Sequence, residues 1–328
     1  MIITKTPFRI SFCGGGSDLS SFYRQHEGCV LSTSINKYCY IVIHPYFDEH
    51  QTLLKYSQTE LVDDIRDIQH RIFRCVLNDY GLHGVEIVST ADVPAGTGLG
   101  SSSTFTVGLL HAVNSYHGKF VSKGWLAKEA CKVEIEKLGS PIGKQDQYAA
   151  AFGGLNFIRF HADESVSVEP IVMQPETYRR LDANLILFYT GLKHDANAIL
   201  SKQSANMSQT DKVASLRAMT QLARDMKAAL EANDLSSFGR ILDEGWQRKR
   251  TLANGITRPE IDAIYAKAMR SGALGGKLLG AGGGGFFLFY CEQEQQERLR
   301  AALGLRAFDF HFERDGSSVI YIGDKYWD

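Results

Sequence analysis

The chain has 328 residues, 44% of them hydrophobic and 22% charged, an ordinary balance for a globular protein of one large or two smaller domains. Its formal net charge of -1 provides no global basic field for nucleic acid. No apolar run approaches the roughly 20 residues of a membrane span, and the first residues do not resemble a signal peptide. The six cysteines form no CxxC pair. We therefore expect a cytoplasmic protein with no membrane partner.

Strand patterns dominate the first part of the chain. The segment "CYIVIHPYF" (39–47) is rich in β-branched and aromatic residues, and "VEIVST" (85–90) alternates between apolar and polar residues. After Ser103 the apolar residues Phe105, Leu109, Val113 and Tyr116 recur at helical spacing. The glycine-rich segment in between is therefore expected to connect a strand to a helix, whose first turn the serine hydroxyls can cap.

The remaining elements alternate less regularly. After a helix from Ser122 to Gly139, "GKQDQYAAAFGG" is expected to be a loop entering a short helix. The further expectations are strands at 155–160 and 184–191, helices over 208–232, 238–246 and 258–271, an apolar strand after "GAGGGGF" (280–286), and the closing strands "FDFHF" and "SVIYIG". The change of pattern predicts two domains, residues 1–185 and 186–328.

The segment "PAGTGLGSSS" (94–103) has the chemistry of a phosphate cradle. Glycines let the backbone approach a ligand, the helix N-terminus attracts anions, and serine hydroxyls can donate to phosphate or bind Mg²⁺. The spacing favours this interpretation, while a glycine-rich turn that only packs closely stays open. A P-loop is excluded because no lysine follows the glycines, and a dinucleotide fingerprint because the third glycine comes one position too early.

Two more glycine clusters accompany this segment. One is Gly14–Gly16, between Arg9 and Asp18, and the other is "GAGGGGF". Each alone could be a tight bend at a sheet edge. Three such clusters in one chain suggest several loops that converge on one ligand, because bare backbone costs conformational entropy on folding.

Together, "TPFRISFCGGGSD", "PAGTGLGSSS" and "KLLGAGGGGFF" resemble the three motifs of the galactokinase–homoserine kinase–mevalonate kinase–phosphomevalonate kinase (GHMP kinase) superfamily, in the right order and across nearly the whole chain. The resemblance implies an α+β GHMP kinase fold. Its N-terminal domain would be ribosomal-protein-S5-like with a left-handed βαβ element, its C-terminal domain ferredoxin-like, and the ligand cleft would lie between them. It also implies an enzyme that uses ATP and Mg²⁺.

The resemblance also implies roles for individual residues. Ser102 and Glu134 would hold Mg²⁺, with Glu136 as the alternative because the register before Asp146 differs by one residue from mevalonate kinases. The ATP phosphates would be bound by Pro94, Gly96, Gly98, Leu99, Gly100, Ser101 and Ser102.

At the acceptor, the resemblance makes Asp146 the group that takes the hydroxyl proton. Arg9 would pair with Asp146 or with the transferring phosphoryl group, and Lys144 is a candidate second cation. The sugar would be bound by Gly15, Gly16, Asp18, Gly282 and Gly283.

The motifs look most like those of heptose 7-phosphate kinases. This likeness implies transfer to the anomeric C1 hydroxyl of D-glycero-D-manno-heptose 7-phosphate, giving the 1,7-bisphosphate for nucleotide-activated heptose and lipopolysaccharide or capsule synthesis. The acceptor phosphate would need a basic cluster, for which Lys193, His194, Arg248–Arg250 and Lys277 are candidates; a solvated surface is an equal alternative for 248–250.

Other functions stay open at this point. The alternatives are a galactokinase- or fucokinase-like sugar-1-kinase, a kinase for an isoprenoid or amino-acid alcohol, and a non-catalytic regulator that binds a sugar or nucleotide. A small-molecule sugar phosphate is the expected partner. The oligomeric state is undetermined, with a homodimer as one option.

Overall fold

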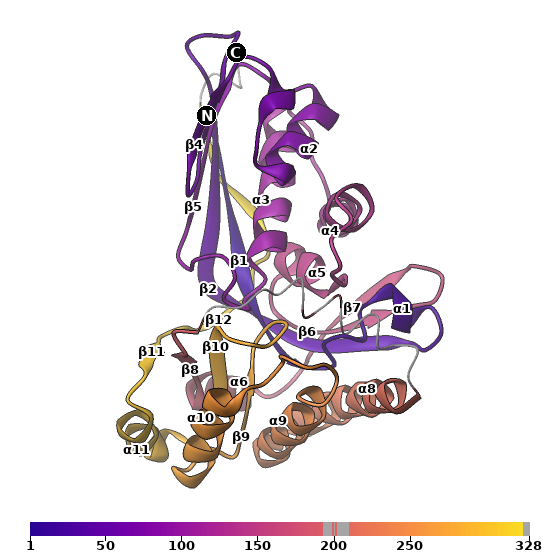
Figure 1. Ribbon diagram of the computed structural model, residues 1–328, viewed down its shortest axis with the longest axis vertical. Coiled ribbons are helices and arrows are strands. Elements are labelled where there is room, and N and C mark those ends of the chain that lie inside the picture. Colours follow the sequence, from indigo (N-terminus) through magenta and orange to yellow (C-terminus); the bar gives the residue numbers. More distant parts are fainter. Residues whose placement is uncertain (193–198, 200, 202–209, 324–328) are drawn as a thin grey trace.

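The computed structural model describes residues 1–192, 199, 201 and 210–323. Two sheets organise the molecule, a large one with long strands and a small one beside a group of helices (Figure 1). Within the described residues, no helix is long and apolar enough to cross a membrane.

Two long antiparallel strands form the centre of the large sheet. β1 (Ile2–Cys13) pairs with β2 (Gly28–Pro45) from Ile2↔Ile43 to Cys13↔Leu31. The sheet order is β13-β1-β2-β5-β3-β4, while β6 and β12 pair with β2 and β7 pairs with β6. The other strands are β3 (Thr52–Lys55), β4 (Thr59–Val62), β5 (Val85–Ala91), β6 (Leu155–Phe160), β7 (Val166–Pro170), β12 (Phe312–Glu313) and β13 (Ser318–Ile322).

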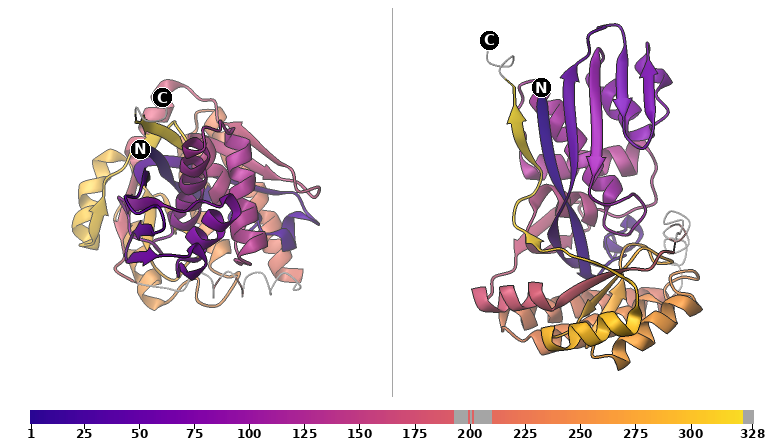
Figure 2. Two further views of the ribbon diagram at one scale, coloured as in Figure 1. Left: turned by 90° about the horizontal axis from the view of Figure 1, so that it is seen from above. Right: turned by 90° about the vertical axis from the view of Figure 1, so that its left-hand side faces the viewer.

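Helices cover one face of this sheet (Figure 2). α3 (Ser101–Tyr116) packs on β1 and β2 and is buried on most sides, because residues of different faces, such as Thr104, Leu110 and Ala112, all lie in the core. α4 (Lys123–Cys131) continues into a π-helical turn, η2 (Lys132–Lys137), and α5 (Gln145–Phe152) follows. The remaining helices of this half are α1 (Ser20–Tyr23), the 3₁₀ turn η1 (Ile65–Asp67) and α2 (Arg71–Tyr80).

The small sheet has four strands in the order β11-β8-β10-β9. Its central strands, β8 (Leu185–Tyr189) and β10 (Phe286–Tyr290), are almost wholly apolar and buried. The other elements of this half are α6 (Pro175–Asn184), α8 (Thr210–Glu231), α9 (Leu235–Lys249), α10 (Pro259–Arg270), β9 (Gly275–Leu278), α11 (Gln293–Leu303) and β11 (Arg306–Phe308).

The two halves share a hydrophobic core. α8 and α9 pack against the ends of β1 and β2, and one cluster of buried residues runs from the large sheet into these helices. The rings of Phe12 on β1 and Phe238 on α9 lie edge to face, with centroids 5.2 Å apart. The ends of the central strands are thereby held against the second half of the chain.

Most of the expected elements are confirmed, with informative differences. The strand expected at 39–47 belongs to the longer β2, the helix expected from Ser122 to Gly139 breaks into α4 and the π-helical turn, and "FDFHF" is divided between β11 and β12. The expected 1–185 and 186–328 division stays a prediction. β12 and β13, from the end of the chain, pair with β2 and β1 in the large sheet.

Candidate functional site

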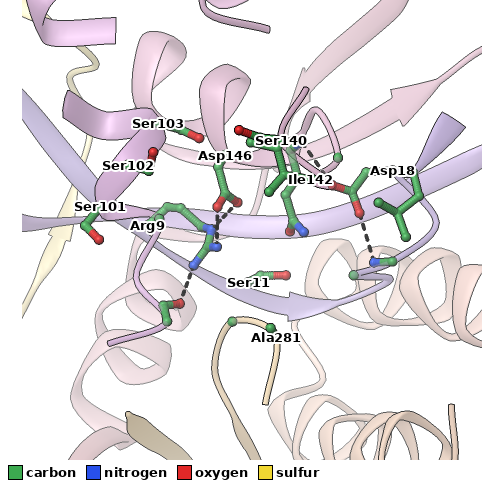
Figure 3. Close-up of a pocket in the computed structure, with 18 of the residues that line it drawn as sticks. Arg9, Ser11, Asp18, Ser101, Ser102, Ser103, Ser140, Ile142, Asp146 and Ala281 are labelled. Carbon is green, nitrogen blue, oxygen red and sulfur yellow. Dashed lines mark hydrogen bonds and ion pairs between the residues drawn. The ribbon is translucent and has the colours of Figure 1, made fainter. Parts of the chain in front are cut away.

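A cavity of about 280 Å³ lies where the glycine loops of both halves meet. Its walls come from the end of β1, the loop before α3, the start of α5, α9 and the loop after β9 (Figure 3). The lining residues are Arg9, Ser11, Gly15, Gly16, Asp18, Leu19, Gly96, Gly98, Gly100–Ser103, Ser140, Ile142, Gly143, Gln145, Asp146, Lys249, Lys277, Gly280 and Ala281.

The loop before α3 exposes backbone to this cavity and packs against the loop after β9. Gly98 has φ +86°, and a Cβ there would lie 2.6 Å from the carbonyl oxygen of Leu279. Gly280 has φ +68°, and a Cβ there would lie 2.5 Å from the Cα of Gly98. Only glycine fits at these two positions, where backbone contacts backbone. The N-terminus of α3, with its unpaired amides, then faces the cavity.

The serines that begin α3 face a buried carboxylate. Ser102 Oγ donates to Glu134 Oε1 at 2.6 Å, and Gln147 Nε2 donates to Glu134 Oε2 at 2.7 Å. Burial raises the pKa of Glu134, and hydrogen bonds from Ser102, Ser103 and Gln147 oppose that rise. Glu134 projects from the π-helical turn η2, a feature often found at functional sites.

A bidentate ion pair lies at the centre of the cavity. Arg9 donates from Nε to Asp146 Oδ1 at 2.6 Å and from Nη2 to Asp146 Oδ2 at 2.7 Å (Figure 3). Its third nitrogen, Nη1, donates to the carbonyl oxygen of Gly98 at 2.7 Å. Arg9 is buried, whereas the side chain of Asp146 stays 23% exposed toward the cavity. The arginine thus fixes both carboxylate oxygens and joins them to the loop before α3.

A second carboxylate lies on the other side of the cavity. Asp18 Oδ1 accepts from the amide of Gly16 at 2.9 Å, and Oδ2 accepts from the amide of Gln145 at 3.3 Å. Burial raises the pKa of Asp18, and the nearby charge of Asp146 raises it further. The two carboxylates therefore differ in their partners, because backbone amides hold Asp18 and the guanidinium of Arg9 holds Asp146.

The C-terminal half contributes two buried ammonium groups. Lys277 Nζ donates to the carbonyl oxygen of Phe12 at 3.0 Å, and Lys249 Nζ donates to those of Leu278 and Gly280. Burial lowers the pKa of Lys277 to about 8 and that of Lys249 well below its ordinary value. The mutual repulsion of the two cations contributes to the shift of Lys249.

Several residues predicted from the sequence lie outside the cavity lining. Pro94 is exposed and accepts a hydrogen bond from Thr97, while Leu99 is fully buried and accepts from the amide of Arg9. Gly282 packs against Ile256, and the amide of Gly283 donates to the same residue. The neighbours Gly280 and Ala281 line the cavity in their place.

Some of the candidate charges also point elsewhere. Lys144 pairs with Glu164 and lies over the ring of Tyr23, away from the cavity, and Glu136 is exposed. Arg248 and Arg250 form ion pairs with Glu244 and Asp262. Lys193 and His194 lie outside the described residues.

Sequence reasoning missed several polar residues within the quoted segments. Ser11 Oγ and Gln145 Oε1 line the cavity as buried atoms without a hydrogen-bond partner among the described residues. Gln147 holds Glu134, and Ser103 also reaches that carboxylate. The signal available for Ser11, Gln145 and Gln147 was that they lie within two residues of Arg9 or Asp146.

Comparison with known proteins identifies the family. The GHMP kinases N terminal domain matches residues 67–154, and the GHMP kinases C terminal domain matches residues 226–309. A D-glycero-alpha-D-manno-heptose 7-phosphate kinase of Campylobacter jejuni is 30% identical, over 96% of this chain and 97% of its own. The chain is a GHMP kinase.

Other GHMP kinases resemble it over most of their length. The crystal structure of a D-glycero-D-manno-heptose 1-phosphate kinase from Bacteroides thetaiotaomicron is 27% identical, with a TM-score of 0.80, and the match covers 99% of this chain and 100% of that one. A galactokinase of Pyrococcus furiosus is 25% identical over 86% of both chains. The expected α+β GHMP kinase fold and an ATP-dependent kinase activity are thus confirmed.

Proposed function

We propose that this GHMP kinase transfers the γ-phosphoryl group of ATP to the anomeric C1 hydroxyl of D-glycero-D-manno-heptose 7-phosphate. The observation that carries the proposal is the Arg9–Asp146 pair, held within one cavity beside the open N-terminus of α3. The similarity to a heptose 7-phosphate kinase supports the acceptor. A non-catalytic regulator has no use for a carboxylate held this way, so we favour an enzyme.

The loop before α3 is the proposed site of the ATP phosphates. The amides at the start of α3 and the helix dipole both attract anions, and Gly96, Gly98 and Gly100 leave the backbone bare beside them. Together with Ser101 and Ser102, this loop offers hydrogen-bond donors for the phosphates on one wall of the cavity.

Ser102 and Glu134 are the proposed Mg²⁺ ligands. Hydroxyl and carboxylate oxygens are hard donors, and Mg²⁺ typically takes one or two carboxylates and completes its shell with phosphates and water. When bound, the ion would neutralise negative charge on the transferring phosphoryl group.

Asp146 is the proposed acceptor of the hydroxyl proton. Its carboxylate oxygens are oriented by Arg9 and retain lone pairs for a substrate O–H. Phosphoryl transfer depends mainly on positioning and charge stabilisation, so a fixed carboxylate orients the C1 oxygen and takes its proton as the new O–P bond forms. The guanidinium of Arg9 remains close to the transferred negative charge.

The sugar is proposed to lie between Asp146 and Asp18. Asp18, Ser11 and Gln145 place carboxylate, hydroxyl and amide groups on this part of the wall, and two of these groups carry buried oxygens without partners among the described residues. Buried polar atoms are normally hydrogen-bonded, so this wall suits a ligand with several hydroxyl groups. An isoprenoid alcohol would leave these atoms unpaired.

A coupled ADP-release assay tests the proposal. The acceptors are D-glycero-D-manno-heptose with and without its 7-phosphate, galactose, fucose and mevalonate, and ³¹P NMR locates the new phosphate. We expect the heptose 7-phosphate to give the highest kcat/KM and a product phosphorylated at C1. Turnover of mevalonate without turnover of any sugar would refute the proposed acceptor.

The product would be the heptose 1,7-bisphosphate, which carries the anomeric phosphate that a nucleotidyltransferase uses in sugar activation. We therefore place the reaction in the cytoplasm, before the synthesis of a surface polysaccharide.

A further inference from the structure

Lys249 and Lys277 belong to the sequence candidates for an acceptor-phosphate cluster, and the proposed phosphoryl transfer does not yet use them. Lys249 ends α9 and Lys277 lies on β9, so both come from the second half of the chain. They are 6% and 5% exposed and both line the cavity. An ammonium group has three donors, and Lys277 uses one of them, for the carbonyl oxygen of Phe12.

The positive charge of this pair is not balanced by the protein. No ion pair joins either ammonium group to a carboxylate of the described residues. Lys249 is repelled by Lys277 and Arg9 and attracted by Asp18. Lys277 is repelled by Arg9, and the charge of Cys13 would attract it if that thiol ionised. A buried cation without a counterion is costly, so the pair is suited to an anion that enters the cavity.

Two anions are candidates, the ATP phosphates and a phosphate on the acceptor. The ATP phosphates already have the α3 N-terminus and Ser102, with Glu134 beside Ser102 as a proposed Mg²⁺ ligand. Lys277 is instead anchored at Phe12, three residues along β1 from Arg9, or roughly 10 Å in an extended strand. The C1 hydroxyl and the 7-phosphate are likewise at opposite ends of the sugar.

We propose that Lys249 and Lys277 bind the phosphate group of the acceptor and thereby select a phosphorylated sugar over a free one. The proposal rests on the proposed function, because it takes Asp146 to mark the position of the reacting hydroxyl. The acceptor then spans both halves of the molecule, with its reacting end at Asp146 and its phosphate at the lysine pair.

The test compares Lys249→Met and Lys277→Met with the wild-type enzyme. Methionine keeps much of the apolar volume and removes the charge, so folding should survive, which thermal unfolding checks. Lys267→Met, at an exposed position on α10, is the matched control for the loss of one lysine charge. The substrates are D-glycero-D-manno-heptose 7-phosphate and the same heptose without phosphate.

We expect each cavity variant to lower kcat/KM for the phosphorylated sugar about 10-fold to 100-fold, mainly through KM, because a hydrogen bond between charged groups is lost. The ratio of kcat/KM for phosphorylated over free heptose should fall, while the KM for ATP stays unchanged. Lys267→Met should leave that ratio as in the wild type. If a methionine variant does not fold, Lys→Gln at the same position replaces it.

The outcomes separate this inference from the proposed function. If the wild-type enzyme does not accept heptose 7-phosphate, the proposed function fails. If it does, but the variants keep the wild-type ratio, the lysine assignment alone is wrong. A rise in the KM for ATP, or in ATP hydrolysis without acceptor, would instead assign the lysines to the nucleotide phosphates and would also overturn the inference.

Discussion

Asp146 combines a partly exposed carboxylate with a buried cation that holds it from behind. Replacement by asparagine keeps the shape and one acceptor for Arg9 but removes the proton acceptor. For Asp146→Asn we expect kcat to fall about 10²-fold to 10⁴-fold, the usual contribution of a general base. The affinity for ATP should change little. ADP release gives kcat and calorimetric titration gives the affinity; full activity of the variant would show that another group takes the proton.

The titration of the single residue Lys277 predicts that binding of the acceptor depends on pH. Its pKa lies near 8 in the protein, and it faces Cys13, Arg9 and Lys249. Burial raises the pKa of Cys13 to about 11, so this thiol stays neutral while the lysine titrates. Only the protonated lysine attracts an anion, and the affinity is therefore full below pH 8 and declines as the pH rises through it.

We accordingly expect the KM for heptose 7-phosphate to rise above about pH 8, and the KM for ATP to follow a different profile. The sugar phosphate itself is a dianion above roughly pH 6, so its own ionisation does not cause this change. Initial rates from pH 6.5 to 9.5 provide the measurement. A KM that stays flat across pH 8 would contradict the role of Lys277, and Lys277→Met should abolish the rise.

At the scale of elements, the contact between Gly98 and Gly280 couples the loop before α3 to the loop after β9. A Cβ at Gly280 would lie 2.5 Å from backbone, in addition to the strain of its positive φ. Gly118 has nearly the same φ, +67°, and open space around it. Gly280→Ala should therefore lower the free energy of unfolding by about 1–3 kcal/mol more than Gly118→Ala, the usual range for overpacking.

The same change should raise the KM for ATP, because the phosphate loop must shift to make room. Chemical denaturation and initial rates test both parts on the two variants. Equal effects of the two substitutions would mean that the loop contact has no energetic importance.

Elements with strong local signals could be predicted from sequence. Leu109 and Val113 recur at helical spacing because α3 is packed into the core, and the glycine motifs stand out because they are continuous segments. α11 could not be found this way, since Leu299 is its one buried residue and its other positions follow no apolar period. The same holds for the short strands at the edge of the large sheet.

The residues of the site can be divided in the same way, into those with a local sequence signal and those without one. Arg9 and Asp146 belong to motifs and were assigned together, while the register left Glu134 and Glu136 open as metal ligands. Glu134 is buried and Glu136 is exposed, and the metal role stays a prediction. The contact of Lys277 with Phe12 joins residues far apart in sequence, and no local pattern can specify it. The contacts that could not be predicted from the sequence depend on how the two halves of the chain pack together.

At the scale of the whole molecule, two hydrophobic clusters that each contain residues of both halves predict cooperative unfolding. α8 and α9 bury apolar side chains in the same cluster as β1 and β2, including the Phe12–Phe238 pair. We expect a single calorimetric transition, with calorimetric and van't Hoff enthalpies in agreement. Phe238→Leu should lower its midpoint without dividing it. Two separate transitions in the wild-type protein would show that the halves are energetically independent.

The pairing of β13 with β1 has a consequence for synthesis on the ribosome. Residues Ile2–Lys5 find their partners in Ser318–Ile322, so one edge of the first strand stays unpaired until nearly the whole chain has been translated. An unpaired strand edge is a template for other nascent chains. The large sheet is therefore completed only after β13 has been synthesised, and an N-terminal fragment that stops before β12 will expose this edge permanently.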